Sequence, residues 1–230
     1  MRQLTLTPRI VEVRQNVLKK NDILARALRE RFQASGVYVV NLVSSPGAGK
    51  TTALTHILTE LSTSHRVAAI VGDLATENDA ERLRESGADV RQITTGTVCH
   101  LEAQMVEEAL HGWSLDTLDF LFIENVGNLV CPASYDLGEH ERVVLFSVTE
   151  GEDKPEKYPT LINSSDTVIM TKMDLAEAVD FNRERFLRAV ERVRPGIAVY
   201  EISAKTGAGL KEWANRLIEA RNNIFPMVQN

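Results

Sequence analysis

Residues 44–52 have the sequence SSPGAGKTT, which is the composition of a loop that binds phosphate groups. The segment follows an apolar run that ends at Val43 and precedes the helical stretch ALTHILTEL. In that order the backbone N–H groups of the turn and of the helix N-terminus point at phosphate oxygens. Lys50 then reaches the β- and γ-phosphates, and the Thr51 hydroxyl binds Mg²⁺. The residues expected to contact the nucleotide here are Gly47, Ala48, Gly49, Lys50, Thr51 and Thr52.

Position 44 departs from the usual pattern of this loop, G-x-x-x-x-G-K-S/T, because it holds Ser44 instead of glycine. Gly47 and Gly49 remain where the backbone most needs conformational freedom. The alternative interpretation is an ordinary strand-to-helix turn that contains a lysine. The flanking strand-length and helical stretches favour nucleotide binding over that alternative.

The segment TKMD at positions 171–174 stands where a guanine-binding motif, N/T-K-x-D, follows a strand. The Asp174 carboxylate can accept hydrogen bonds from the ring N1–H and the 2-amino group of guanine, which adenine does not offer. The Lys172 side chain would lie along the base. Thr171 replaces the commoner Asn, and we expect this change to weaken one tether to the phosphate-binding loop. The alternative is a strand end followed by a helix cap at Asp174.

A second segment also indicates guanine. Ser203, Ala204 and Lys205 follow a later strand-length run and match the loop in which a backbone N–H meets the O6 atom of the base. Each segment alone is a weak signal. Together, at this distance after the phosphate-binding loop, they predict binding of GTP and GDP rather than of adenine nucleotides.

Two acidic strand ends indicate how Mg²⁺ is held and how the nucleotide is cleaved. Asp73 ends the run VAAIVGD, where it would bind Mg²⁺ through water or orient the attacking water; the alternative is a turn residue beside Gly72. Residues 124–128, ENVGN, which we call the switch segment, occupy the place of the D-x-x-G switch of GTPases. The Gly127 N–H would donate to the γ-phosphate. Glu124 stands in the place of the usual Asp and is expected to be among the nucleotide-binding residues.

The expected catalytic residues are therefore Lys50, Asp73 and Gly127, and the expected Mg²⁺ ligands are Thr51 and Asp73. No glutamine stands beside Gly127 to hold the attacking water. We expect turnover well below ~1 s⁻¹ without help.

The only two cysteines of the sequence fall near these motifs. Cys99 and His100 are adjacent, and Cys131 follows the switch segment. Thiolate and imidazole ligands suit Ni²⁺ or Zn²⁺, and three of them leave a tetrahedral site one ligand short. A free cysteine is often a small buried apolar residue, so spacing alone leaves metal binding and plain packing open. The position of Cys131 just after the switch segment favours metal binding.

Seven strand-length apolar runs must position these residues, with helical stretches between most of them. They are residues 37–43, 67–71, 90–93, 118–123, 143–148, 167–170 and 197–202. Runs rich in Val and Ile with intervening helices are typical of a parallel sheet covered on both faces. The predicted fold class is α/β, a doubly wound and mostly parallel sheet of the P-loop NTPase type, also called a G domain.

The first 36 residues have a different texture and predict an N-terminal helical arm, residues 1–36, ahead of the P-loop domain, residues 37–230. Apolar residues recur near the helical period among charged ones. They are Ile10, Val13, Val17, Leu18, Ile23, Leu24 and Leu28. We expect this helix to cover one edge of the core; the alternative is a helix that binds a partner.

Composition excludes several other classes. The 230 residues are 43% hydrophobic and 25% charged, which is typical of a globular protein and not of a disordered one. A net charge of −6 argues against a general nucleic-acid binder. No apolar run approaches the ~18 residues needed to cross a membrane, and the charged start is unlike a signal peptide. We therefore expect a cytoplasmic protein without nucleic-acid or membrane partners.

The motifs together resemble one family, the HypB accessory GTPases that insert nickel during maturation of nickel-iron hydrogenases. The matching segments are SSPGAGKTT, GDLATENDAERL, GTVCHLEAQM, IENVGNLVCPASYDLGE, EGEDKPEKYP, TKMDL and SAKTGAGL. The resemblance implies that Cys99, His100 and Cys131 are the metal ligands of the G domain. It also implies a homodimer formed or tightened by GTP, and delivery of Ni²⁺ to the hydrogenase large subunit with a companion nickel carrier.

Two features of some family members, an N-terminal cysteine motif and a histidine-rich tract, are not found in the sequence, so we expect transient rather than tight nickel binding. Two alternatives remain. One is a P-loop GTPase of another maturation pathway, for urease or a cobalamin enzyme, although the urease GTPase carries a Cys-Pro-His motif that is absent here. The other is a signalling GTPase whose cysteines only pack. The choice between Ni²⁺ and Zn²⁺ also stays open.

Overall fold

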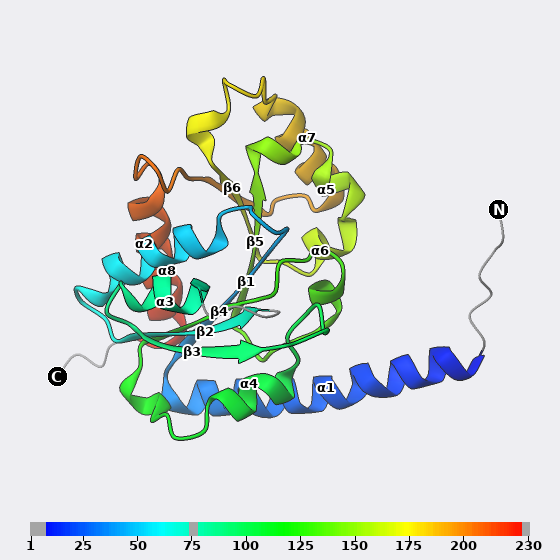
Figure 1. The fold of residues 1–230 in the computed structure, drawn as a ribbon, viewed down its shortest axis with the longest axis vertical. Coiled ribbons are helices and arrows are strands. Elements are labelled where there is room, and N and C mark those ends of the chain that lie inside the picture. The colour runs from blue at the N-terminus through cyan, green and yellow to red at the C-terminus, as the bar shows by residue number, and fades with distance from the viewer. Residues whose placement is uncertain (1–7, 74–77, 227–230) are drawn as a thin grey trace.

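The protein is built around one parallel sheet. The computed structural model describes residues 8–73 and 78–226, with side chains from residue 15 onward. Within these residues seven strands pair in the order β3-β2-β4-β1-β5-β6-β7 (Figure 1). The strands are β1 Tyr38–Ser44, β2 Val67–Asp73, β3 Asp89–Thr94, β4 Phe120–Glu124, β5 Glu141–Ser147, β6 Thr167–Thr171 and β7 Ala198–Glu201. The helices are α1 Pro8–Ser35, α2 Lys50–Ser62, α3 Asn78–Arg84, α4 Ala103–Ala109, α5 Lys154–Lys157, α6 Pro159–Asn163, α7 Arg183–Val193 and α8 Leu210–Ile224.

Every pairing in the described sheet is parallel, so the expected mostly parallel sheet is parallel throughout. All seven residues of β1 are buried because helices cover both faces of the sheet. Alternate residues of β1 enter different cores: Tyr38, Val40 and Leu42 pack with α2, α3 and α8. Val39 faces the other side, where α1 and α4 lie. The predicted α/β, doubly wound P-loop fold is confirmed.

Helix α1 covers one face of the sheet with its second half only. Asn21, Ala25, Leu28 and Phe32 recur at helical spacing and are buried. The first half of the helix projects beyond the sheet (Figure 1). Leu28 was correctly expected on the packed face, but Ile23 is 59% exposed. None of the described helices is long and apolar enough to cross a membrane.

The apolar pattern of the arm therefore predicted its inward face poorly. Val17 is 42% exposed, and Leu18 and Leu24 are half-buried. The side chains of Ile10 and Val13 lie outside the described residues. The prediction failed because the buried stripe follows Ala25 and Asn21, two residues that a hydrophobic pattern does not select.

The parallel arrangement brings the carboxyl ends of the strands to one edge. Strand β1 runs into the phosphate-binding loop, and its neighbour β4 ends at Glu124, directly opposite Leu42. Strand β2 ends at Asp73, and β6 ends at Thr171. In open parallel sheets ligands bind at this edge, beside the point where the strand order reverses. In this sheet that point is β1, which lies between β4 and β5.

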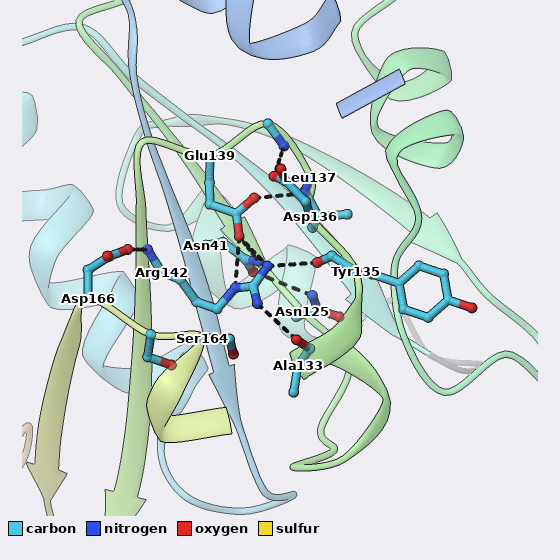
Figure 2. Close-up of polar contacts among 12 residues, drawn as sticks. Asn41, Asn125, Ala133, Tyr135, Asp136, Leu137, Glu139, Arg142, Ser164 and Asp166 are labelled. Carbon is cyan, nitrogen blue, oxygen red and sulfur yellow. Dashed lines mark hydrogen bonds and ion pairs between the residues drawn. The ribbon is translucent and has the colours of Figure 1, made fainter. Parts of the chain in front are cut away.

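A buried ion pair anchors residues 131–140, which we call the Cys131 segment, to the start of β5 (Figure 2). The Arg142 guanidinium lies 2.7 Å from Glu139 Oε1, and the two side chains are 8% and 5% exposed. Arg142 Nη2 also donates to the carbonyl of Tyr135 at 2.7 Å. On the other side Asn41 Nδ2 donates to Glu139 Oε1 at 3.0 Å, which ties the pair to β1. The Cys131 segment begins with a short 3-10 helix, Cys131–Ser134, and charge-assisted hydrogen bonds hold the rest of it in place.

Replacing Arg142 by Met should lower the free energy of unfolding by about 3–5 kcal/mol, because it leaves the Glu139 carboxylate buried without its cation. Denaturant unfolding of the two proteins measures the difference. The control is Arg188→Met, which removes an exposed ion pair with Glu184 and should cost no more than about 0.5 kcal/mol. Equal small losses in both variants would mean that the buried pair does not anchor the segment.

Candidate functional site

The phosphate-binding loop has the backbone shape that its sequence predicts. Gly47 and Gly49 have φ of +73° and +94°, a region that favours glycine, and α2 begins at the next residue, Lys50. Ser44 is the last residue of β1 and is fully buried, so this position does not need glycine. Its hydroxyl accepts a hydrogen bond from Lys50 Nζ at 3.0 Å. The departure at position 44 is therefore compatible with a closed loop.

Two buried charges of opposite sign face each other behind this loop. Lys50 and Glu124 are 8% and 3% exposed. Burial raises the pKa of Glu124 to about 7, although Lys50 and a hydrogen bond from Thr51 oppose the shift. Burial lowers the pKa of the Lys50 ammonium, and Glu124 opposes that shift. Both charges are poorly solvated, so a bound phosphate and a bound cation would each relieve part of the cost.

Glu124 meets the residue that was expected to bind Mg²⁺. Thr51 Oγ1 donates to Glu124 Oε1 at 2.7 Å. The other carboxylate oxygen, Glu124 Oε2, is buried and accepts no hydrogen bond. A hydroxyl, a carboxylate with an open oxygen and Asp73 on the same cavity form a donor set of oxygens, which is what Mg²⁺ prefers. These residues fit the ion, and Glu124 joins Thr51 and Asp73 as a candidate ligand that sequence analysis assigned only to the nucleotide.

A cavity of about 460 Å³ opens over the loop and collects most of the expected phosphate and Mg²⁺ residues. Its wall includes Gly47, Gly49, Lys50, Thr51, Thr52, Asp73, Glu124 and Gly127. Two charged residues of α3, Asp79 and Arg82, also line it. Arg82 Nη2 donates to Thr52 Oγ1 at 2.9 Å. Sequence analysis missed both because a charged helix is usually a solvated surface, and only the tertiary fold brings α3 over the loop.

Gly127 packs against the phosphate-binding loop. A Cβ atom added to Gly127 would lie 3.0 Å from the Cα atom of Pro46, a backbone contact that leaves little room for any side chain. Any side chain at this position would push the switch segment and the loop a few tenths of an ångström apart, so glycine favours their close approach.

The residues expected to read the base surround a second cavity of about 220 Å³, next to the first. Its lining includes Thr171, Lys172, Asp174, Ala204 and Lys205. Ser203 does not line it; instead Ser203 Oγ donates to Asp174 Oδ1 at 2.6 Å and orients the carboxylate. Lys172 has a φ of +58°, a rare conformation for a non-glycine residue that often marks a functional site.

Two hydrogen bonds join residues 171–174, the segment expected to read the base, to the phosphate-binding loop. Thr171 Oγ1 donates to the Ala48 carbonyl at 2.6 Å. Lys172 Nζ donates to the Gly47 carbonyl at 2.7 Å. The tether that we expected Thr171 to weaken is therefore present, because the threonine hydroxyl reaches the same loop. Ala48 is positioned by this contact and is itself buried.

Cys99, His100 and Cys131 come together in a single cluster, although 32 positions separate the two cysteines. Their ligand atoms all lie within 4.8 Å of one another. The two sulfur atoms are 2.9 Å apart, and Cys99 Sγ lies 3.9 Å from His100 Nδ1. Sequence spacing left metal binding and packing open; the cluster has the soft donors that suit Ni²⁺ or Zn²⁺. We call these three residues the ligand cluster.

The surroundings of the cluster favour a neutral, oriented imidazole. The His100 ring packs against Tyr135 with ring centres 3.9 Å apart. Burial lowers the pKa of His100, with Glu102 opposing the shift, and neutral imidazole is the form that binds metals. A cavity of about 510 Å³ adjoins His100 and Cys131, so the ligand cluster is reachable from outside.

Comparison with known proteins agrees with this geometry. Residues 38–201 match the family model described as CobW/HypB/UreG, nucleotide-binding domain. The chain is 48% identical over 209 residues to hydrogenase maturation factor HypB of Escherichia coli K12, covering 91% of this chain and 72% of that protein. It is 41% identical over 224 residues to hydrogenase/urease maturation factor HypB of Helicobacter pylori, covering 96% and 92%.

A solved structure is similar as well. The crystal structure of HypB from Helicobacter pylori in complex with nickel superposes with a TM-score of 0.85 at 41% identity, covering 92% of this chain and 99% of that one.

The raised pKa of Glu124 predicts a pH-dependent stability difference in protein free of nucleotide and Mg²⁺. Between the ordinary carboxyl pKa and about 7 the folded state holds a proton that the unfolded state has lost, so the parent loses stability as pH rises through 7. Glu124→Gln carries no titrating group at this position, so its free energy of unfolding relative to the parent should rise by on the order of 1–3 kcal/mol between pH 5 and pH 8, whatever constant offset the loss of a partner for Lys50 adds. Denaturant unfolding at both pH values measures the gap.

The control is Glu60→Gln, an exposed position on α2, which should stay within about 0.5 kcal/mol of the parent at both pH values. A Glu124→Gln gap of the same size at pH 5 and pH 8 would contradict a buried carboxyl with a raised pKa.

Proposed function

The chain belongs to the HypB family of hydrogenase maturation factors, and from that premise we propose that it is a slow GTPase that delivers nickel. In this proposal GTP binding and hydrolysis change the affinity of the ligand cluster for the metal it carries. The observation that carries the proposal is the meeting of Cys99, His100 and Cys131 in one cluster, with the last of them directly after the switch segment.

Nucleotide binding in this proposal uses the two adjoining cavities. Gly47, Gly49 and the N-terminus of α2 offer backbone N–H groups to the phosphates, and Lys50 supplies a cation that the site keeps poorly solvated. Asp174, oriented by Ser203, accepts from the N1–H and 2-amino group of guanine. An adenine base cannot supply these two donors to the Asp174 carboxylate, which is the physical basis for preferring GTP.

Hydrolysis is proposed to depend on positioning and charge rather than on a strong base. Thr51, Glu124 and Asp73 would hold Mg²⁺, which supplies charge neutralisation at the β- and γ-phosphates. Lys50 stabilises the charge that develops on the phosphate oxygens, and the Gly127 N–H donates to the γ-phosphate. Lys50 and the Gly127 N–H do not remove a proton from the attacking water, which fits turnover well below ~1 s⁻¹.

Nickel is the cargo in this proposal. The similar Helicobacter pylori HypB structure is a complex with nickel, which supports that choice over Zn²⁺ for a chain of the same family. Two thiolates and one imidazole leave at least one coordination position for a donor or acceptor molecule. An incomplete ligand set binds metal less tightly than a closed one and suits transfer. We propose that the fourth position is filled by water or by a second copy of the chain in a GTP-dependent homodimer.

The proposed partners are a companion nickel carrier, which loads or receives the metal, and the hydrogenase large subunit. Access to the ligand cluster from the 510 Å³ cavity supports direct handover between proteins. The net charge of −6 makes nucleic acid an unsuitable partner.

Asp174→Asn should change the base preference from guanine to xanthine, because an amide can donate to the carbonyl that xanthine has in place of the 2-amino group. We expect GTP affinity to fall about 100-fold, because the amide oxygen still accepts from the N1–H but the hydrogen bond from the 2-amino group to a charged acceptor is lost. Competition binding and phosphate release with GTP and with xanthosine triphosphate measure both preference and hydrolysis. The control Asp180→Asn, at an exposed position, should keep the guanine preference; unchanged GTP affinity in Asp174→Asn would remove its base-reading role.

Cys131→Ala should weaken Ni²⁺ binding by more than the roughly 10- to 100-fold that loss of an outer-shell partner costs, because it removes a direct thiolate ligand. Competition with a chelator measures the affinity at matched protein concentration, since a site shared between subunits would otherwise report dimerisation. The control is Ser134→Ala, which removes a hydroxyl from the same cavity without removing a ligand. Equal nickel affinities in parent and Cys131→Ala would exclude Cys131 as a ligand.

A further inference from the structure

The side chain of Asn128 contacts both chain segments that carry the cysteines. Asn128 Nδ2 donates to the backbone carbonyl of Cys99 at 3.3 Å. Asn128 Oδ1 accepts from the backbone N–H of Val130 at 2.8 Å, one residue before Cys131. A single amide in the switch segment therefore joins the backbone of Cys99 to that of Val130, the residue before Cys131.

Asn125, at the other end of the switch segment, holds the residue on the far side of His100. Its Oδ1 atom accepts from the Leu101 N–H at 3.1 Å and from the Val126 N–H at 3.0 Å. Asn125 is 1% exposed, so this carbonyl oxygen has no water to bond instead. The two amides thus hold the Cys99–Leu101 stretch on both sides of the imidazole ligand.

The same segment touches the nucleotide site at three points. Glu124 accepts from the Thr51 hydroxyl, and Gly127 packs against Pro46 of the phosphate-binding loop. The Asn125 N–H donates to the Leu42 carbonyl in the strand that leads into this loop. Any displacement of the switch segment by the γ-phosphate is therefore passed to Asn125 and Asn128.

Small displacements are enough to matter at the ligand cluster. Two thiolates bound to one metal at ~2.3 Å lie roughly 3.3–3.8 Å apart, depending on geometry. The sulfur atoms of Cys99 and Cys131 are 2.9 Å apart, so they must move apart by less than one ångström to accept a metal, and a small shift of either segment changes this spacing. The Asn128 amide spans the two segments that must separate.

From these contacts we infer that Asn128, supported by Asn125, is the positioning residue that couples the bound nucleotide to the spacing of the metal ligands. The inference rests on the proposed function, because it identifies how that function is regulated. Asn128 touches neither the nucleotide nor the metal; it acts through the backbones of Cys99 and Val130.

The simpler role for Asn128 is a local turn, since an asparagine side chain often accepts from the N–H two residues later. That role accounts for the bond to Val130 but not for the bond to Cys99, which is 29 positions away. Asn128→Asp separates the two roles. The carboxylate keeps the acceptor for Val130 and has no N–H to donate to the Cys99 carbonyl.

The experiment measures Ni²⁺ affinity in the GDP state and in the state with a non-hydrolysable GTP analogue, and compares the ratio of the two affinities between proteins. A ratio of ~5 to 150 is the usual range for coupled sites, and the parent should fall within it. Asn128→Asp and Asn128→Ala should both lower the ratio to within about twofold of unity. A uniform effect of the added charge on nickel affinity cancels in the ratio, and the uncharged Ala variant checks this.

The matched control is Asn223→Asp, an exposed position on α8, which should keep the parent ratio. Nickel binding is followed by the thiolate-to-nickel charge-transfer absorption, which should persist in both Asn128 variants. If either folded variant keeps the parent ratio, the inference is overturned while the proposed function stands. Loss of that absorption in both nucleotide states also overturns it, because Asn128 would then build the site rather than couple it.

A parent ratio of one would instead overturn the coupled function, and the inference with it. Should Asn128→Ala fail to fold, Asn128→Asp, which keeps the local turn, decides alone. Linkage gives an independent measurement of the same ratio. The factor by which the nucleotide state changes the affinity for Ni²⁺ must equal the factor by which Ni²⁺ changes the affinity for the GTP analogue relative to GDP.

Discussion

The architecture of the site depends on two buried and opposite charges, Lys50 at the start of α2 and Glu124 at the end of β4. Neither charge is well solvated, and the hydroxyl of Thr51 satisfies only one of the two Glu124 oxygens. Phosphate oxygens and a divalent cation would complete both environments, so the free energy of burial favours ligand binding. The sheet makes this possible, because the parallel register sets Glu124, at the end of β4, opposite Leu42, just before the phosphate-binding loop.

Only the short stretch of chain from Glu124 to Cys131 separates the nucleotide site from the ligand cluster along the sequence. Glu124 belongs to the first and Cys131 to the second, and the switch segment connects them. What makes this connection specific is the polar packing around it: Asn125 donates to Asn41 at 3.4 Å, and Asn41 donates to Glu139, whose partner Arg142 holds the Cys131 segment (Figure 2). A fully bonded buried network resists gradual deformation, which favours movement of the segment between discrete positions.

Helix α1 contributes to the same region from outside the G-domain sheet. Asn21 donates to the Asp136 carbonyl at 2.8 Å and accepts from the Ala103 N–H at 2.9 Å. One polar residue of α1 thus contacts the Cys131 segment and the start of α4, which follows His100. The helix therefore supports the two loops that carry the ligand cluster as well as covering the sheet.

The sequence by itself predicted the strands, the phosphate-binding loop and the position of residues 171–174 after a strand, because each depends on local order: an apolar run, a glycine-rich turn and a helix in succession. It also singled out Cys99, His100 and Cys131, but spacing left open whether they meet. Only the tertiary structure decided that, along with the contact of Glu124 with Thr51 and the place of Arg82 over the loop. It also decided which face of α1 is buried, since Val17 and Ile23 point outward while Asn21 points in. The physical reason is the same in each case: contacts between residues distant in sequence are set by strand order and helix packing, which a local pattern does not encode.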